Sequence, residues 1–236
     1  PDPLTEVTQT PSIIWKTMGD SAQMICTHIL GSGYYQMYWY RQHQGESMRL
    51  IVFTTTGSKD FGDFKEDKYS TVKTFAQTRI SYLGFLELFD MASMCCANYE
   101  AYFGAGTKLT VLDPQKEIRG PVVEVLPPSE AELCKKKKKD NVTLLCVAKN
   151  FYPDHVYVSW EIDNDVKREK TKDVPIEKDG NYIISSRLRV PKKDWKSGKK
   201  FTCIVYYYNG TGYEPFQDSI SGVLLFRGAS STGSSS

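Results

Sequence analysis

The sequence has no run of about 20 consecutive apolar residues, which is the length that a membrane-spanning helix requires. It also has no N-terminal pattern typical of a signal peptide. The net charge is only +2, from 30 basic and 28 acidic residues, so the charge balance does not indicate a nucleic-acid partner. These absences predict a globular chain, which we expect to be a mature or truncated part of a longer protein.

Histidine is scarce. The three histidines, His28, His43 and His155, fall in different predicted strands or loops. None lies at a Cys/His spacing suited to zinc or in a recognisable nucleophile motif. We therefore expect no enzyme activity, no metal site and no cofactor. A basic run, Lys135–Lys139, could attract a membrane surface, although a solvated loop is the interpretation we favour.

Strand-forming residues are abundant by contrast. Aromatic residues make up 13% of the chain, with 15 Tyr and 11 Phe, and Gly and Pro interrupt the sequence at short intervals. A β-rich chain of 236 residues is long enough for two domains of about 100–120 residues each. We predict an all-β protein with two domains.

Four of the six cysteines fall into two similar frames, Cys26…Trp39…Cys96 and Cys146…Trp160…Cys203. In each frame the Trp follows the first Cys by 13 or 14 residues. This spacing resembles the immunoglobulin sandwich, in which a Trp of one central strand packs against a disulfide that joins the two sheets. The resemblance implies two tandem immunoglobulin-like β-sandwiches, a V-type followed by a C-type, with one disulfide inside each frame.

Breaks in the alternation of apolar and polar residues divide the chain into four segments. The predicted segments are a V-type domain at 1–112, a linker at 113–120, a C-type domain at 121–227 and a flexible tail at 228–236. The tail is rich in Ser and Gly, and we interpret it as an artificial linker rather than as part of the fold.

The cysteines and two sequons indicate the cellular compartment. Stable disulfides require an oxidising compartment. Asn141 and Asn209 each begin an Asn-x-Thr sequon, a glycosylation acceptor that only a secretory route would use. Sequons also occur by chance, so both residues are candidates only. We expect an extracellular protein.

The segment after Cys96 is the most informative part of the sequence. Six residues separate Cys96 from a Phe-Gly-x-Gly motif that begins at Phe103 and leads into the predicted strand 107–112. This arrangement resembles the joining segment of rearranged antigen receptors of lymphocytes. The resemblance implies a variable domain followed by a constant domain.

Residues 90–96 are similar to the Asp-x-Ala-x-Tyr-x-Cys pattern of variable domains, with Met94 in place of Tyr. The pattern selects Cys96 as the partner of Cys26. Because adjacent strand residues face opposite sides of a sheet, Cys95 is then expected on the outer face, where a partner would cover it.

Several segments resemble the β chain of the T-cell receptor, namely 6–11, 39–42, 128–132, 151–156 and 185–190. The hairpin at 209–212 is short, whereas mammalian β constant domains carry a long insertion there, so we expect a non-mammalian vertebrate source. Segments 103–112 and 195–197 look similar to antibody light chains of lambda type. A light chain and an invariant tandem-immunoglobulin cell-surface receptor therefore remain alternatives.

The resemblance implies an antigen-recognition chain that binds peptide held by a major histocompatibility complex molecule. Three loops, at 29–36, 54–59 and 98–101, would form the binding end of the variable domain. Their mixture of Tyr, Gly and Ser is typical of binding loops, although ordinary turns favour Gly and Ser as well. The expected antigen contacts are Gly31, Ser32, Tyr34, Tyr35, Thr55, Thr56, Asn98, Tyr99 and Glu100.

The resemblance also implies a heterodimer with an α-type chain at the plasma membrane, which would signal through separate membrane subunits. The expected partner contacts are Tyr40, Gln42, Cys95, Phe103, Glu130, Glu132, Arg187 and Arg189. Without the resemblance, the four charged residues would be interpreted as solvated. Cys134 could form an interchain bridge, but an unpaired thiol is the interpretation we favour.

Overall fold

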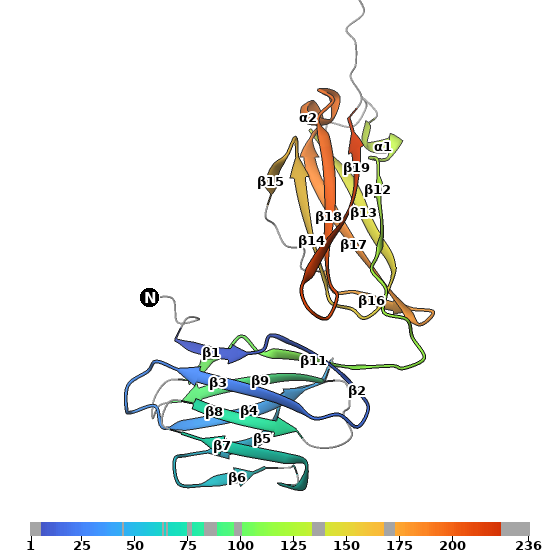
Figure 1. Ribbon diagram of the computed structural model, residues 1–236. Coiled ribbons are helices and arrows are strands. Elements are labelled where there is room, and N and C mark those ends of the chain that lie inside the picture. The colour runs from blue at the N-terminus through green and yellow to red at the C-terminus, as the bar shows by residue number, and fades with distance from the viewer. Residues whose placement is uncertain are drawn as a thin grey trace, which may run out of the picture. The chain divides into compact units, whose positions relative to one another are not determined.

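A computed structural model describes residues 6–43, 45–62, 64, 66–74, 77–82, 89–96, 101–133, 140–167 and 173–222. The chain forms two compact units, Pro1–Gln115 and Lys116–Ser236, and the described part of each consists almost entirely of strands (Figure 1). The boundary between the units falls inside the segment 113–120, and Lys116 makes an ion pair of 3.2 Å with Glu177 of the second unit. Each unit is described below by itself.

The first unit contains two sheets. The smaller sheet has the order β1-β3-β8-β7, with strands β1 (Val7–Thr10), β3 (Ala22–His28), β8 (Gln77–Tyr82) and β7 (Tyr69–Lys73). The larger sheet has the order β2-β11-β9-β4-β5-β6, with β2 (Ile13–Thr17), β11 (Thr107–Leu112), β9 (Phe89–Cys96), β4 (Gln36–Gln42), β5 (Arg49–Thr54) and β6 (Lys59–Phe61). Strand β10 (Ala101–Phe103) pairs with β9, and a short 3-10 helix, η2 (Glu66–Lys68), precedes β7. The two strands β5 and β6 beyond β4 are the additional strands that distinguish a V-type sandwich.

The core of the first unit follows the period of two that a half-buried strand requires. In β3 the side chains of Ala22, Met24 and Cys26 are buried, and the intervening Gln23 is exposed. Trp39 of β4 is completely buried. The inward positions that alternation predicts in β3 and β4 are therefore confirmed for these residues.

The second unit also contains two sheets of four strands. One sheet has the order β12-β13-β17-β16, with β12 (Val122–Leu126), β13 (Asn141–Phe151), β17 (Asn181–Pro191) and β16 (Ile176–Lys178). The other has the order β15-β14-β18-β19, with β15 (Asp165–Lys167), β14 (Val156–Ile162), β18 (Lys200–Tyr208) and β19 (Tyr213–Ser221). Two short helices, α1 (Glu130–Leu133) and α2 (Lys192–Lys196), connect strands. The prediction of tandem immunoglobulin-like sandwiches is confirmed.

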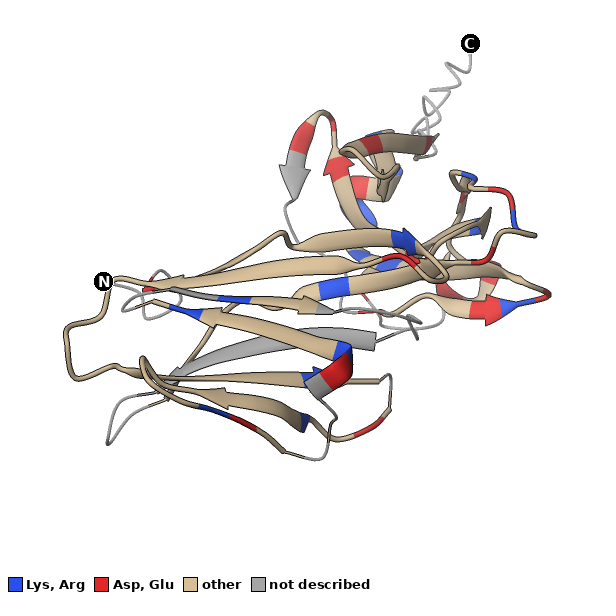
Figure 2. Ribbon diagram, turned by 60° about the horizontal axis from the view of Figure 1, so that its bottom comes forward, with Lys and Arg blue, Asp and Glu red and all other residues tan. Residues whose placement is uncertain are grey.

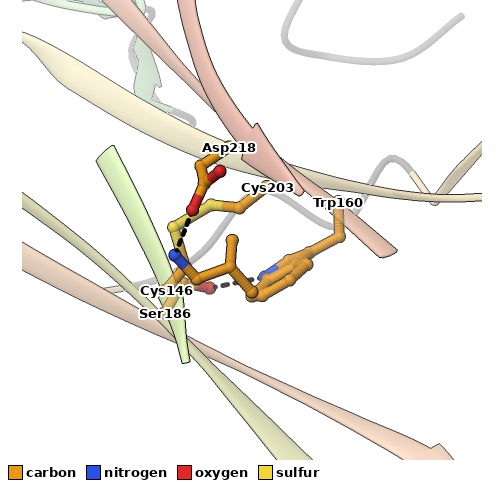
Figure 3. Close-up of a disulfide and its surroundings, with 6 residues drawn as sticks. Cys146, Trp160, Ser186, Cys203 and Asp218 are labelled. Atoms are coloured by element: carbon orange, nitrogen blue, oxygen red, sulfur yellow. Dashed lines mark hydrogen bonds between the residues drawn. A yellow bond between two sulfur atoms is a disulfide. The ribbon is translucent and has the colours of Figure 1, made fainter. Parts of the chain in front are cut away.

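A disulfide joins Cys146 of β13 to Cys203 of β18, as the spacing predicts (Figure 3). Trp160 of β14 lies beside it and is 3% exposed. Asp218 of β19 accepts a hydrogen bond of 2.8 Å from the backbone N–H of Val125 in β12. The disulfide and this bond each join strands of different sheets, so they fix how the two layers of the unit pack together.

Candidate binding surfaces

The strand register brings the stems of the three predicted binding loops to one end of the first sandwich. Strand β4 begins at Gln36, which pairs with Cys96 at the end of β9. The next residue, Met37, pairs with Thr54 at the end of β5. The loop that enters β4 and the loops that leave β5 and β9 therefore begin side by side. Asn98, Tyr99 and Glu100 of the third loop lie outside the described residues.

The first loop is anchored by one tyrosine and exposes the residues around it. Tyr34 packs edge-on against Tyr102 of β10, with 5.7 Å between the ring centroids, and is half-buried. Its backbone N–H donates to the carbonyl of Gly31 at 3.0 Å, which closes a turn. Gly31, Ser32 and Tyr35 are exposed. Of the four contacts predicted here, Tyr34 thus supports the loop while the other three face solvent.

The second loop is a tight hairpin whose shape depends on Thr55. The backbone N–H of Thr55 donates to the carbonyl of Ser58 at 2.8 Å. The Thr55 hydroxyl oxygen accepts hydrogen bonds from the N–H groups of Gly57 and Ser58 at 3.3 and 3.1 Å. Thr56, at the tip, is exposed. Thr55 therefore shapes the turn, and Thr56 is the residue of this pair that is free to reach a ligand.

Sequence reasoning missed residues beside the second loop. A shallow pocket of about 240 Å³ is lined by the loop itself and by Thr71 and Lys73 of β7. Its lining carries several hydroxyl groups and, with Lys59, two ammonium groups. Nothing local in the sequence could have joined β7 to this loop, because the contact depends on how the two sheets pack.

The outer face of β4 carries an aromatic cluster. The rings of Tyr38 and Tyr40 stack with centroids 6.4 Å apart, and Tyr38 also contacts Phe53 of β5 at 4.8 Å. Phe103 is 43% exposed. Tyr38 and Phe103 both pair with the same residue of β9 from opposite sides, so they lie in one row across the sheet. Phe53 was not predicted, although its place between buried Val52 and Thr54 in the alternation could have indicated it.

Two other predicted contacts on this face differ in what can be described. Gln42 is exposed, and its side-chain amide donates to the carbonyl of Glu46 at 2.7 Å. The side chains of β9, which include Cys95 and Cys96, lie outside the described residues. The pairing of Cys26 with Cys96 and the outward position of Cys95 therefore stay predictions.

The outer face of the sheet β12-β13-β17-β16 carries the predicted charged residues of the second unit. Arg187 and Arg189 are exposed on β17, and no described acidic group lies within ion-pair distance of either. Arg189 pairs with Thr143, whose N–H and hydroxyl donate to the carboxylate of Glu132 at 3.1 and 3.0 Å. Glu130 is exposed at the start of α1. Basic and acidic segments alternate over the second unit (Figure 2).

Apolar residues share this face with the arginines. Leu126 is 37% exposed and pairs with Leu145, which in turn pairs with Arg187. Val122 and Ile176 are 46% and 69% exposed on the same sheet. Sequence reasoning missed these residues. The signal was present, because residues 142–148 are apolar at both odd and even positions, which is typical of a strand covered on both faces.

Four tyrosines gather on the other sheet of the second unit. Tyr157 stacks on Tyr206 with 4.7 Å between centroids, and Tyr213 contacts Tyr157 and Tyr208 edge-on at 5.1 and 5.5 Å. Burial raises the pKa of Tyr157 and of Tyr213, and the neighbouring phenols add to both effects. These side chains are therefore neutral at physiological pH and act as an apolar, hydrogen-bonding cluster.

No cluster of three or more His, Cys, Asp or Glu side chains suited to a metal ion occurs in the part of the chain that the structure describes. The described helices are all too short to cross a membrane.

Comparisons with known proteins agree with this architecture. Residues 123–209 match the immunoglobulin C1-set domain family. A viral T-cell receptor beta chain-like protein of feline leukemia virus is 32% identical over 220 residues, which cover 86% of this chain and 67% of that protein. The constant region of the rat Ig gamma-1 heavy chain is 31% identical over 114 residues, 48% of this chain and 33% of the relative. The constant region of rat Ig gamma-2A is 31% identical over 140 residues, 58% of this chain and 41% of the relative.

A V-type sandwich followed by a C1-set sandwich defines a receptor-like chain of the immunoglobulin class. The match to the viral relative extends over both sandwiches, and the chain belongs to the T-cell receptor β chain-like family. Proteins of this kind are not enzymes, which confirms the prediction of no enzyme activity. The chain spans about two thirds of its viral relative and less than half of each rat relative.

Proposed function

We propose that this chain is the antigen-recognition chain of a T-cell receptor heterodimer and that it binds peptide presented by a major histocompatibility complex molecule. The observation that carries the proposal is the convergence of three loop stems at one end of the V-type sandwich, fixed by the pairing of β4 with β5 and β9. Exposed residues of two types surround these stems, small polar ones such as Ser32 and Thr56 and the large Tyr35. Rigid aromatic anchors among adaptable polar residues suit protein recognition.

The proposed partner is an α-type receptor chain. In the first unit it would cover Tyr38, Tyr40 and Phe103, whose apolar rings stand on the outer face of the larger sheet. Cys95 and Gln42 remain proposed contacts there. An exposed apolar cluster on a sheet face is typical of an interaction site, because isolated domains seldom leave such a surface in water.

In the second unit the α-type partner would cover the outer face of β12-β13-β17-β16. Arg187 and Arg189 would lie opposite acidic groups of the partner, beside the apolar side chains of Leu126 and Leu145. Glu130 and Glu132 would complete the seam, although the carboxylate of Glu132 is already engaged by Thr143. Matched charges around an apolar centre favour one partner over others.

The heterodimer would stand at the plasma membrane with both sandwiches outside the cell, and separate membrane subunits would transmit the signal. Cys146–Cys203 supports this location, because a structural disulfide persists in an oxidising compartment.

The loop assignment is tested by single substitutions in the assembled heterodimer. Tyr35→Ala and Thr56→Ala should weaken binding to the cognate peptide complex, Tyr35→Ala by about tenfold, since a central aromatic contact contributes on the order of 1–2 kcal/mol. Ser70→Ala is the matched control, because Ser70 is exposed and lies near the start of β7, at the opposite end of the sandwich. Surface plasmon resonance gives the affinities. Unchanged binding for both loop variants would remove these loops from the site.

A further inference from the structure

The two Asn-x-Thr sequons occupy different structural settings. Asn209 lies in the tight turn between β18 and β19, where its backbone N–H donates to the carbonyl of Gly212 at 3.0 Å. Gly210 at the next position has a φ of 100°, a left-handed conformation that glycine adopts without strain. Gly210 and Thr211 are exposed. The whole Asn209 sequon is therefore presented at the end of a hairpin.

The side chain of Asn209 is held in one orientation. Its Oδ1 accepts hydrogen bonds from the N–H of Thr211 at 3.0 Å, from the Thr211 hydroxyl at 2.9 Å and from the N–H of Gly212 at 3.0 Å. Its Nδ2 donates to the carboxylate of Glu214. Because every described bond to Oδ1 comes from within the turn, the carboxamide nitrogen is directed away from the turn backbone.

Asn141 begins a strand instead of a turn. It pairs with Pro191 in the ladder between β13 and β17, and the middle residue of its sequon, Val142, is completely buried. The hydroxyl of Thr143, the third residue, donates to Glu132 at 3.0 Å. Presentation of this sequon to an enzyme would require the first residues of β13 to leave the sheet.

We propose that Asn209 carries an N-linked glycan and that Asn141 stays unmodified. In the reaction, Nδ2 of Asn209 attacks the anomeric carbon of an oligosaccharide that is activated as a lipid diphosphate. An N–C bond forms, the C–O bond to the diphosphate breaks, the lipid diphosphate leaves, and a base of the transferase accepts the amide proton. The product keeps one N–H on Nδ2, so the bond to Glu214 can persist beside the glycan.

This choice of site has a consequence for assembly, which rests on the proposed function. Strand β13 carries Thr143 and Leu145 opposite Arg189 and Arg187, so a glycan at Asn141 would stand beside the proposed partner face. The Asn209 hairpin belongs to the other sheet of the sandwich. A glycan there leaves the face of Arg187 and Arg189 open.

The test is glycopeptide mass spectrometry of the whole protein, secreted alone from a eukaryotic host. The expected result is one glycan, on the peptide that contains Asn209. Asn209→Gln and Thr211→Ala should each lose this glycan, whereas Thr211→Ser, which keeps the hydroxyl, should retain it. Asn141→Gln is the matched control and should leave the glycan mass unchanged.

Glycan at Asn141, with or without one at Asn209, would overturn the proposal, and so would an unmodified Asn209. The map of the unsubstituted protein decides between these results even where a variant fails to fold. Neither a partner chain nor an antigen is needed, so failure here is distinguishable from failure of the proposed receptor function.

Discussion

The indole Nε1–H of Trp160 donates a hydrogen bond of 3.1 Å to the hydroxyl of Ser186 (Figure 3). Trp160 belongs to β14 and Ser186 to β17, so the bond joins the two sheets of the second unit. Both residues are buried, at 3% and 4% exposure. Ser186 also pairs with Cys146 across the strand ladder, which places this polar contact directly beside the disulfide.

Removal of the Ser186 hydroxyl should therefore destabilise the second unit. Ser186→Ala leaves the buried indole N–H of Trp160 without a partner, at a cost of about 1–3 kcal/mol in the free energy of unfolding. Guanidinium denaturation of the whole protein measures this loss. Ser219→Ala is the control, because Ser219 is exposed on β19 and should change stability by less than about 0.5 kcal/mol. Equal stability of the two variants would contradict the role given to this bond.

Alkaline pH should weaken the fold through Tyr207. Burial raises the pKa of this phenol from 10.0 to about 12, and the carboxylate of Glu214 and the phenol of Tyr152 add to the shift. Since the folded pKa exceeds the unfolded value, the contribution of Tyr207 to stability is complete below about pH 10 and is lost as the pH approaches 12. The free energy of unfolding should fall across this window.

The variant Tyr207→Phe separates Tyr207 from other titrating groups. It loses the 2.6 Å hydrogen bond to the carbonyl of Tyr152, which still accepts from the N–H of Arg119 at 2.9 Å. The expected cost near neutral pH is therefore one hydrogen bond, about 1 kcal/mol. Above pH 10 the stability of the variant should fall less steeply than that of the unsubstituted protein. Parallel pH curves would show that Tyr207 is not responsible.

Charge reversal on β17 should impair pairing with the proposed α-type partner. Arg187→Glu would place a carboxylate where we expect acidic partner groups, and like charges at an interface cost several kcal/mol. We expect at least a tenfold loss of heterodimer affinity, measured by analytical ultracentrifugation. Lys200→Glu, an exposed change on the other sheet, should leave the affinity unchanged. The same loss in both variants would indicate a general charge effect instead of a pairing face.

The partner of Cys26 can be determined from the two adjacent cysteines. The Asp-x-Ala-x-Tyr-x-Cys pattern selects Cys96, while the strand pairing sets Cys95 opposite the buried Met37 and Cys96 opposite Gln36. We expect Cys96→Ser to remove the disulfide and to lower the free energy of unfolding by about 2–5 kcal/mol, and Cys95→Ser to leave the disulfide intact. Non-reducing peptide mapping with tandem mass spectrometry checks the assignment. The reverse pattern would identify Cys95 as the bridging residue.

The sequence predicted those features that repeat locally. Alternation indicated the inward positions of Met24 and Trp39, and the spacing of cysteine and tryptophan indicated the Cys146–Cys203 bridge. Each of these depends on a strand period of two or on a known frame, both of which are visible in a single sequence.

Contacts between distant strands could not be predicted in the same way. The Val125–Asp218 bond joins residues that are 93 positions apart, and neither residue is marked by a motif. The place of Lys73 beside the second loop likewise depends on the packing of one sheet on the other. The engagement of Glu132 by Thr143 also depends on the short helix α1, which alternation does not reveal.

Pairing is the most direct test of the proposed receptor function. The protein would be co-expressed separately with an α-type receptor chain and with an antibody heavy chain from the same species, and the complexes would be identified by size-exclusion chromatography with mass spectrometry. We predict a one-to-one complex with the α-type partner alone. A complex with the heavy chain, or a stable monomer in both cultures, would contradict the proposal.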